Sequence, residues 1–216
     1  MNIPEHTKAF LNMLNRPGAP KFYELGTDAA RRSFSKLHEY FGETGASSVT
    51  HEDCFIEAEA AHRIPYRKYL PQGHGEAGVT RAIVYFHGGG WCLGGITSHD
   101  AVCRRLCQET GLQVYSVDYR LAPEHPFPAA LNDARAVIEK LFSSHSTTPG
   151  FKVFLAGDSA GGNLAVVAAF ELIDAGLSNR VAGNLLVYPA VHADHHSLLC
   201  SPYREGFMLD SGSLDW

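Results

Sequence analysis

The segment Gly-Asp-Ser-Ala-Gly at residues 157–161 places a serine at the apex of a tight turn. An apolar run over 151–156 precedes it, and a run with helical spacing over 163–173 follows it. The sequence therefore predicts a strand, a sharp turn and a helix in that order. Small residues flank the serine because a larger side chain would clash there. In such a turn the hydroxyl is exposed at the end of a sheet, so Ser159 is a candidate nucleophile.

A second glycine-rich segment, His-Gly-Gly-Gly-Trp at residues 87–91, follows an apolar run over 81–86. Consecutive glycines let backbone N–H groups face a ligand with no Cβ in the way. A serine nucleophile needs such donors for the oxyanion that forms during acyl transfer. No Gly-Lys-Ser/Thr follows the glycines, which excludes a phosphate-binding P-loop. Residues 88–95 also contain no intact dinucleotide-binding fingerprint.

Apolar runs alternate with helical patterns over the rest of the chain, which indicates an α/β fold. Continuous apolar strands between helices predict a mostly parallel sheet that is covered on both faces. The predicted strands of this part are 81–86, 113–117, 151–156 and 181–188, and the predicted helices are 101–109, 129–142 and 163–173. Two helices, 5–14 and 28–41, and an antiparallel pair of strands, 54–59 and 62–70, precede them.

Three residues are expected to mark helix ends. Ser98 can cap the helix over 101–109, and Gly111 can end it. A last short helix is expected to begin at Asp210 or Ser211.

Size and composition argue against several classes of protein. A chain of 216 residues can bury a sizeable core, and its net charge of -5, without a basic run among aromatics, argues against a nucleic-acid partner. No apolar stretch approaches the ~20 residues of a membrane span, and the N-terminus lacks a signal pattern. Five cysteines, an odd number at irregular spacings, are typical of reduced thiols. We expect a soluble, cytoplasmic protein.

Three motifs occur in order: His-Gly-Gly-Gly-Trp at 87–91, Asp-Tyr-Arg-Leu-Ala-Pro-Glu at 118–124 and Gly-Asp-Ser-Ala-Gly-Gly-Asn-Leu at 157–164. On these motifs the chain resembles the hormone-sensitive lipase family of α/β-hydrolases. The resemblance implies an α/β-hydrolase core over 46–216 and cap helices over 1–45. It also implies a carboxylesterase or lipase that needs no cofactor and acts on short- to medium-chain acyl esters.

Carried over residue by residue, the resemblance makes Ser159 the nucleophile. It assigns the backbone donors of the oxyanion hole to three residues: Gly88, Gly89 and Ala160. It gives His87 and Gly90 the task of shaping the oxyanion loop. Asp158 and the segment 118–124 are interpreted as structural.

In this family the catalytic acid and histidine lie on the loops after the next two strands, and the sequence ends at Trp216 before either. We therefore expect a fragment with an incomplete triad. A local base is a weaker alternative, from a polar segment after the last strand: His192, Asp194, His195 and His196. These imidazoles could also collect zinc or nickel without function, so no metal site is predicted.

Two further hypotheses stay open: a catalytically dead hydrolase-fold protein that binds small molecules, and a decayed gene product. The strand over 181–188 would also have a bare apolar edge, because no further strand is available to cover it. An edge of this kind is a template for pairing with another chain, so self-association is expected.

Overall fold

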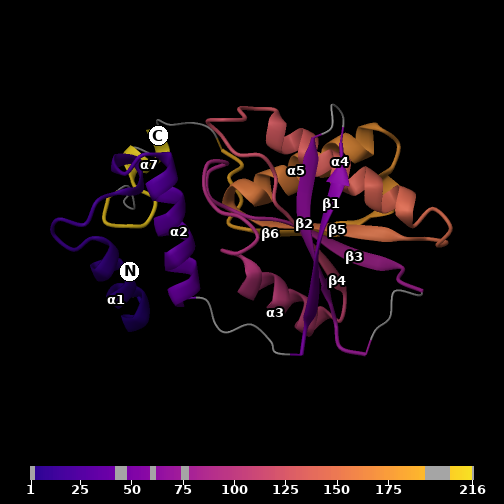
Figure 1. The fold of residues 1–216 in the computed structure, drawn as a ribbon, viewed down its shortest axis with the longest axis horizontal. Coiled ribbons are helices and arrows are strands. Elements are labelled where there is room, and N and C mark those ends of the chain that lie inside the picture. Colours follow the sequence, from indigo (N-terminus) through magenta and orange to yellow (C-terminus); the bar gives the residue numbers. More distant parts are fainter. Residues whose placement is uncertain (1–2, 42–47, 59–61, 74–77, 193–204, 216) are drawn as a thin grey trace. The chain divides into compact units, whose positions relative to one another are not determined.

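The computed structural model of the protein describes residues 3–41, 48–58, 62–73, 78–192 and 205–215. A six-stranded sheet forms the centre of the larger part, with helix α3 on one face and helices α4 and α5 on the other (Figure 1). This arrangement confirms the predicted α/β fold with helices on both faces. Within the described residues, no helix has both the length and the apolar character to cross a membrane.

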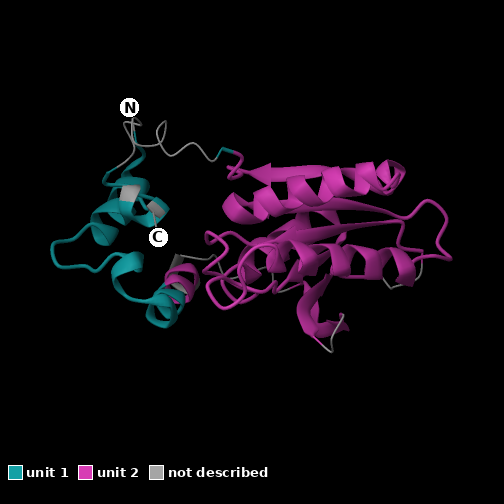
Figure 2. Cartoon of the chain, turned by 90° about the horizontal axis from the view of Figure 1, so that it is seen from above, with its two compact units in different colours: residues 1–33, 192–216 teal, residues 34–191 magenta. Residues whose placement is uncertain are grey.

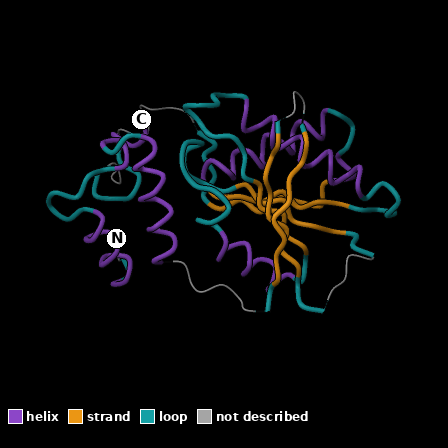
Figure 3. The backbone as a smooth tube through the Cα atoms, viewed as in Figure 1, coloured by secondary structure: helices purple, strands orange, loops and turns teal. Residues whose placement is uncertain are grey.

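The strands, drawn orange in Figure 3, follow the order β1-β2-β4-β3-β5-β6 across the sheet. Their bounds are β1 Thr50–Glu57, β2 Arg63–Leu70, β3 Arg81–Phe86, β4 Gln113–Val117, β5 Lys152–Asp158 and β6 Val181–Val187. Strands β1 and β2 are antiparallel to each other, and β2 is antiparallel to β4, whereas β4, β3, β5 and β6 are parallel. The sheet is therefore mostly parallel, as the apolar runs predicted.

The helices agree with the sequence prediction to within a few residues. Their bounds are α1 Glu5–Leu14, α2 Thr27–Phe41, α3 Asp100–Thr110, α4 Ala129–Ser144, α5 Ser159–Asp174 and α7 Ser211–Asp215, with short 3-10 turns η1 Phe22–Glu24 and η3 Ser178–Arg180. The largest difference is at α5, which begins at the serine itself. The small residues after Ser159 read as a loop in the sequence, but they form the first turn of this helix.

Two hydrophobic clusters cover the two faces of the sheet. Cys103 and Cys107 of α3 are fully buried and pack with Tyr85 and Val114, so these cysteines hold the helix against the sheet. The cluster on the opposite face is larger and joins the strands to α4 and α5. Its fully buried members include Leu155 in β5.

The helix ends were predicted in part. Gly111 ends α3 in the left-handed conformation (φ 66°), as expected. Asp210 precedes α7, and its carboxylate accepts the Ser213 N–H at 3.0 Å, which is the expected capping. The prediction for Ser98 is wrong: the residue at the start of α3 is His99, and the Ser98 hydroxyl donates to the carbonyl oxygen of Gly95 at 2.9 Å.

The chain divides into two compact units, residues 1–33 with 192–216 and residues 34–191 (Figure 2). This division differs from the predicted domains, 1–45 and 46–216. The end of α2 belongs with the sheet because Phe34 is buried and His38 contacts His99. The capping role predicted for residues 1–45 stays a prediction.

Replacing Leu155 with alanine is expected to lower the free energy of unfolding by about 2–5 kcal/mol, because the substitution leaves a cavity in a packed core. Leu155 is fully buried, whereas Leu185 on the neighbouring strand β6 is 43% exposed. The matched control Leu185→Ala should therefore cost about 0.5 kcal/mol or less. Urea denaturation of both variants measures the difference, and equal losses would contradict the described burial.

Candidate active site

Ser159 lies in a strained turn between β5 and α5. Its φ of 50° falls in the left-handed region, which residues with a side chain seldom adopt. Glycine is required at two neighbouring positions, because a Cβ at either would clash with the backbone of Phe86. A Cβ on Gly157 would lie 2.5 Å from the carbonyl oxygen of Phe86, and a Cβ on Gly161 would strike the same oxygen. The predicted sharp turn between a strand and a helix is therefore confirmed.

The end of β3 lies beside this turn. Phe86 pairs with Gly157 in the parallel register, so β3 and β5 end at the same level of the sheet. The loop that follows β3, residues 87–91, therefore begins next to Ser159. We call this loop the oxyanion loop.

Three backbone N–H groups near Ser159 have no acceptor among the described residues. Those of Gly89 and Gly90 lie in the oxyanion loop, where both residues have positive φ (122° and 60°). That of Ala160 lies in the first turn of α5, where N–H groups have no partner within the helix. The partial positive charge of a helix N-terminus adds to the attraction for an anion at this end.

The N–H of Gly88 differs from those of Gly89 and Gly90. Its N–H donates to Asp158 Oδ1 at 2.9 Å, so this donor already has an acceptor within the chain. A Cβ at Gly88 would also strike the Asp158 carboxylate, which explains why a glycine stands there. The sequence pattern could not distinguish the three glycines, because the distinction depends on this contact.

His87, the first residue of the oxyanion loop, is completely buried. Its ring stacks on Tyr119 with the centroids 4.2 Å apart, and its Nδ1 lies 2.9 Å from the carbonyl oxygen of Gly88. Burial lowers the pKa of His87 to about 3, with a smaller contribution from the nearby His99. His87 is therefore a neutral packing residue, and its role in shaping the loop stays a prediction.

Asp158 joins three elements of the site. Its Oδ1 accepts the Tyr85 hydroxyl at 2.8 Å as well as the Gly88 N–H, and it lies 3.3 Å from His99 Nε2. Burial alone would raise the pKa of Asp158. The hydrogen bond and charge of His99, with the Tyr85 and Gly88 hydrogen bonds, outweigh this effect and hold the pKa below its ordinary value. These contacts agree with the structural interpretation of Asp158, but its partners Tyr85 and His99 carried no sequence signal.

The segment 118–124 supports the same loop from another side. Arg120 makes two contacts with Asp133 Oδ1, from Nη2 at 2.7 Å and from Nε at 3.0 Å, and Asp133 is 1% exposed. The N–H of Ala122 donates to the carbonyl oxygen of Trp91 at 2.9 Å. The segment is thus fixed to α4 and to the oxyanion loop, consistent with a structural role.

A mainly apolar cavity of about 340 Å³ lies beside the oxyanion loop. Gly90 and Trp91 form one wall, and the side chain of Phe127 lines another part of it. Val167 contributes from α5, two turns after Ser159. The cavity falls within the range of about 300–1,000 Å³ that small-molecule sites occupy.

The residues predicted as an alternative base are mostly outside the described part. Asp194, His195 and His196 are not described, and His192 is described and exposed. Within the described residues, Ser159 Oγ has no hydrogen-bond partner. The described residues also contain no group of histidine, cysteine and acidic side chains that could hold a metal ion.

A known protein family matches more than half of this chain. The sequence pattern of a family described as having the alpha/beta hydrolase fold matches residues 83–216. The match covers the oxyanion loop, the segment 118–124 and the turn at Ser159.

Two curated relatives are similar to much of the chain. The carboxylic ester hydrolase LipN of Mycobacterium tuberculosis is 39% identical over 166 residues, which are 72% of this chain and 42% of the relative. The ethyl acetate hydrolase of Pseudomonas putida is 29% identical over 198 residues, which are 90% of this chain and 62% of the relative. The chain thus spans about half the length of these relatives.

A solved structure is also similar over the whole chain. The hyperthermophilic esterase from the archaeon Pyrobaculum calidifontis has a TM-score of 0.85 and is 32% identical. The similarity covers 100% of this chain and 69% of that esterase.

Lowering the pH below about 6.5 is expected to destabilise the protein. An unfolded histidine has a pKa of about 6.5, whereas burial lowers that of folded His87 to about 3. Between these values the unfolded chain binds a proton that the folded chain does not. The contribution of His87 to the free energy of unfolding is therefore complete above pH ~6.5. It is lost towards pH ~3, by up to about 1.4 kcal/mol per pH unit. Burial also lowers the pKa of His38, which acts in the same direction.

Urea denaturation at pH ~7.5, ~6.5 and ~5.5 measures this dependence. The variant His87→Asn keeps a neutral polar group and should show a shallower slope, at a lower overall stability. An unchanged slope in this variant would show that His87 is not the group that titrates.

Proposed function

The chain belongs to the α/β-hydrolase fold family, in its hormone-sensitive lipase branch, and on this premise we propose that it is a serine carboxylic-ester hydrolase. One observation carries the proposal: Ser159 begins a helix at positive φ, beside backbone donors that have no acceptor among the described residues. The named activities of the relatives, carboxylic ester hydrolase and ethyl acetate hydrolase, support the same reaction class.

In the proposed reaction, Ser159 Oγ attacks the carbonyl carbon of the ester. The Oγ–C bond forms while the carbonyl oxygen becomes an oxyanion, and the alcohol then leaves with a proton. Water hydrolyses the resulting acyl-serine and releases the carboxylic acid. The carboxyl ends of β3 and β5 meet at one level, which supports a single reacting centre there.

We assign the oxyanion hole to the N–H groups of Gly89, Gly90 and Ala160. Gly90 replaces Gly88 in the original prediction, because the Gly88 N–H is donated to Asp158. Donors that are fixed before the reaction stabilise the developing charge more than solvent water does. Gly88 and His87 then have a positioning role.

The apolar cavity beside Gly90 supports a short or medium acyl or alcohol group as the part of the substrate that binds there. Its volume of about 340 Å³ is at the lower end of small-molecule sites.

The base that activates Ser159 is assigned to residues outside the described part. This assignment rests on the absence of a hydrogen-bond partner for Ser159 Oγ among the described residues. The same observation favours a second candidate, a hydrolase-fold protein that binds small molecules without turning them over. Measured turnover distinguishes the two.

The purified chain is expected to hydrolyse p-nitrophenyl acetate and butyrate slowly but above the uncatalysed rate. Serine hydrolases that lack one triad member keep on the order of 10³-fold catalysis from the oxyanion hole and from substrate binding. The variant Ser159→Ala should lower this turnover, because no acyl-serine can form without the hydroxyl, and the control Ser144→Ala, an exposed serine of α4, should lose none. Turnover of Ser159→Ala equal to that of the parent protein would refute the proposal, and binding without any turnover would favour the second candidate.

We also propose that the protein self-associates through β6. Three consecutive apolar residues of this strand are exposed, Leu185 by 43%, Leu186 by 36% and Val187 by 39%. Successive residues of a strand point to opposite faces, so both faces are open at this strand. Within the described residues, only β5 pairs with β6, and the free edge offers unpaired N–H and carbonyl groups to another chain.

Sedimentation velocity at micromolar concentration is expected to detect dimers or larger species. Leu186→Lys should shift the population towards monomer, because a charged side chain on an edge strand opposes pairing. Val102→Lys, which changes a similarly exposed apolar residue on α3, is the control. A monomeric parent protein would contradict the proposed interface.

We further propose that the protein works in the cytoplasm. Cys54, Cys92, Cys103 and Cys107 are all free thiols. Proteins of oxidising compartments more often carry disulfides, so these thiols support a reducing location.

A further inference from the structure

We infer that His99 is a positioning residue that acts through Asp158 to hold the oxyanion loop in its working conformation. The inference rests on the proposed function, since the loop is given its role there. It assigns a task to a buried histidine that lies at the start of α3, outside the three sequence motifs.

The first step of the argument is the contact between Asp158 and the loop. The Gly88 N–H donates to Asp158 Oδ1 at 2.9 Å, and the loop approaches so closely that no Cβ fits at Gly88. Gly89 and Gly90 follow directly in the chain. The orientation of the Asp158 carboxylate therefore sets where the two following N–H groups point.

The second step is the charge of Asp158. Its side chain is only 13% exposed, and a carboxylate so far from water needs compensating partners. Tyr85 and Gly88 supply two hydrogen bonds. His99 Nε2 lies 3.3 Å from Oδ1, so the imidazole can supply a third, whether it is charged or neutral.

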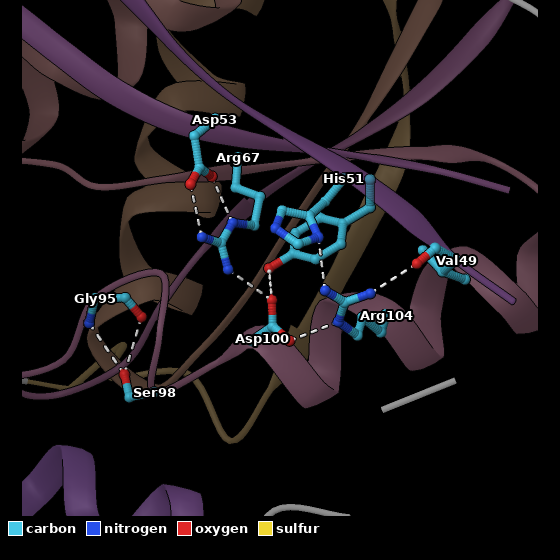
Figure 4. Close-up of polar contacts among 9 residues, drawn as sticks. Val49, His51, Asp53, Arg67, Gly95, Ser98, Asp100 and Arg104 are labelled. Carbon is cyan, nitrogen blue, oxygen red and sulfur yellow. Dashed lines mark hydrogen bonds and ion pairs between the residues drawn. The ribbon is translucent and has the colours of Figure 1, made fainter. Parts of the chain in front are cut away.

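The third step is the way in which His99 itself is held. Its Nδ1 lies 2.8 Å from Ser98 Oγ, and Ser98 Oγ also accepts the Gly95 N–H at 3.0 Å (Figure 4). The ring of His99 lies between two other histidines, with its centroid 5.2 Å from that of His38 and 5.5 Å from that of His87. His99 is 3% exposed, so the imidazole has little freedom to turn away from Asp158.

The pairing does not depend on one protonation state. If Ser98 donates its hydroxyl proton to the carbonyl oxygen of Gly95, Ser98 Oγ can accept an Nδ1–H of a charged His99. If Ser98 instead donates to Nδ1, the neutral His99 carries its proton on Nε2. In both arrangements the Nε2–H donates to Asp158, and the carboxylate keeps its orientation.

The test uses the whole chain with three variants and one control. His99→Ala removes the partner of Asp158. His99→Gln restores an N–H donor at a similar reach. His99→Leu fills a similar space but donates no hydrogen bond to Asp158. His6→Ala, an exposed histidine on α1, is the control.

The first readout is hydrogen exchange of the Gly88 amide, which is protected by its bond to Asp158; NMR measures it, and no activity is needed. We expect His99→Ala to speed exchange there by about ten-fold or more, because the loop opens more often. His99→Gln should restore most of the protection, and the control should change nothing. Unchanged protection in His99→Ala would overturn the inference. If that variant does not fold, His99→Leu decides, and undiminished protection there overturns the inference as well.

The second readout is turnover of p-nitrophenyl acetate. His99→Ala should lower kcat by roughly ten- to a hundred-fold with little change in KM, since misplaced oxyanion donors act in the transition state. A loss that His99→Gln does not rescue would mark His99 as merely structural and overturn the inference. If the parent protein shows no turnover that depends on Ser159, the proposed function fails. The exchange measurement then still decides whether His99 positions the loop.

Discussion

The parallel register between β3 and β5 is the constraint on which the site depends. Phe86 stands opposite Gly157, and the carbonyl oxygen of Phe86 lies where a Cβ of Gly161 would be. Only glycine at both positions lets α5 start so close to the end of β3. The turn that carries Ser159 and the loop that carries Gly89 and Gly90 are therefore fixed by one backbone contact. A shift of one residue in this pairing would separate them.

The loops at this end of the sheet are irregular, and two carboxylates hold them in place of regular secondary structure: Asp158 binds the oxyanion loop, and the buried Asp133 binds Arg120. A third carboxylate, Asp100 of α3, binds Arg67 of β2 at 2.9 Å (Figure 4). Each carboxylate has several donors, which is the condition under which a charge with little exposure to water is tolerated. The apolar clusters keep the helices on the sheet, Asp158 and Asp133 keep the loops beside it, and Asp100 joins the start of α3 to β2.

The sequence predicts the fold well where the signal is local. The strand 113–117 is apolar enough to be recognised and is buried at every position, and Gly111 ends α3 in the conformation that favours glycine. It predicts the position of the nucleophile for the same reason, since strand, turn and helix are contiguous. It fails where a contact joins distant residues. Nothing near Ser98 showed that its hydroxyl would bond to Gly95, and nothing in the glycine run showed that Asp158 would bind Gly88. Both outcomes depend on packing between separate elements, which a local pattern does not contain.

The positive φ at Ser159 is a property of the backbone and does not depend on the chemistry of the side chain. The strain is borne by the main chain at Ser159, while Gly157 and Gly161 leave room for the turn, and neither feature requires a hydroxyl in particular. A thiol at this position would be presented to the same space by the same turn. The turn can therefore present other small reactive side chains in place of the serine. Gly157 and Gly161 have no such replacement, because any Cβ there would clash.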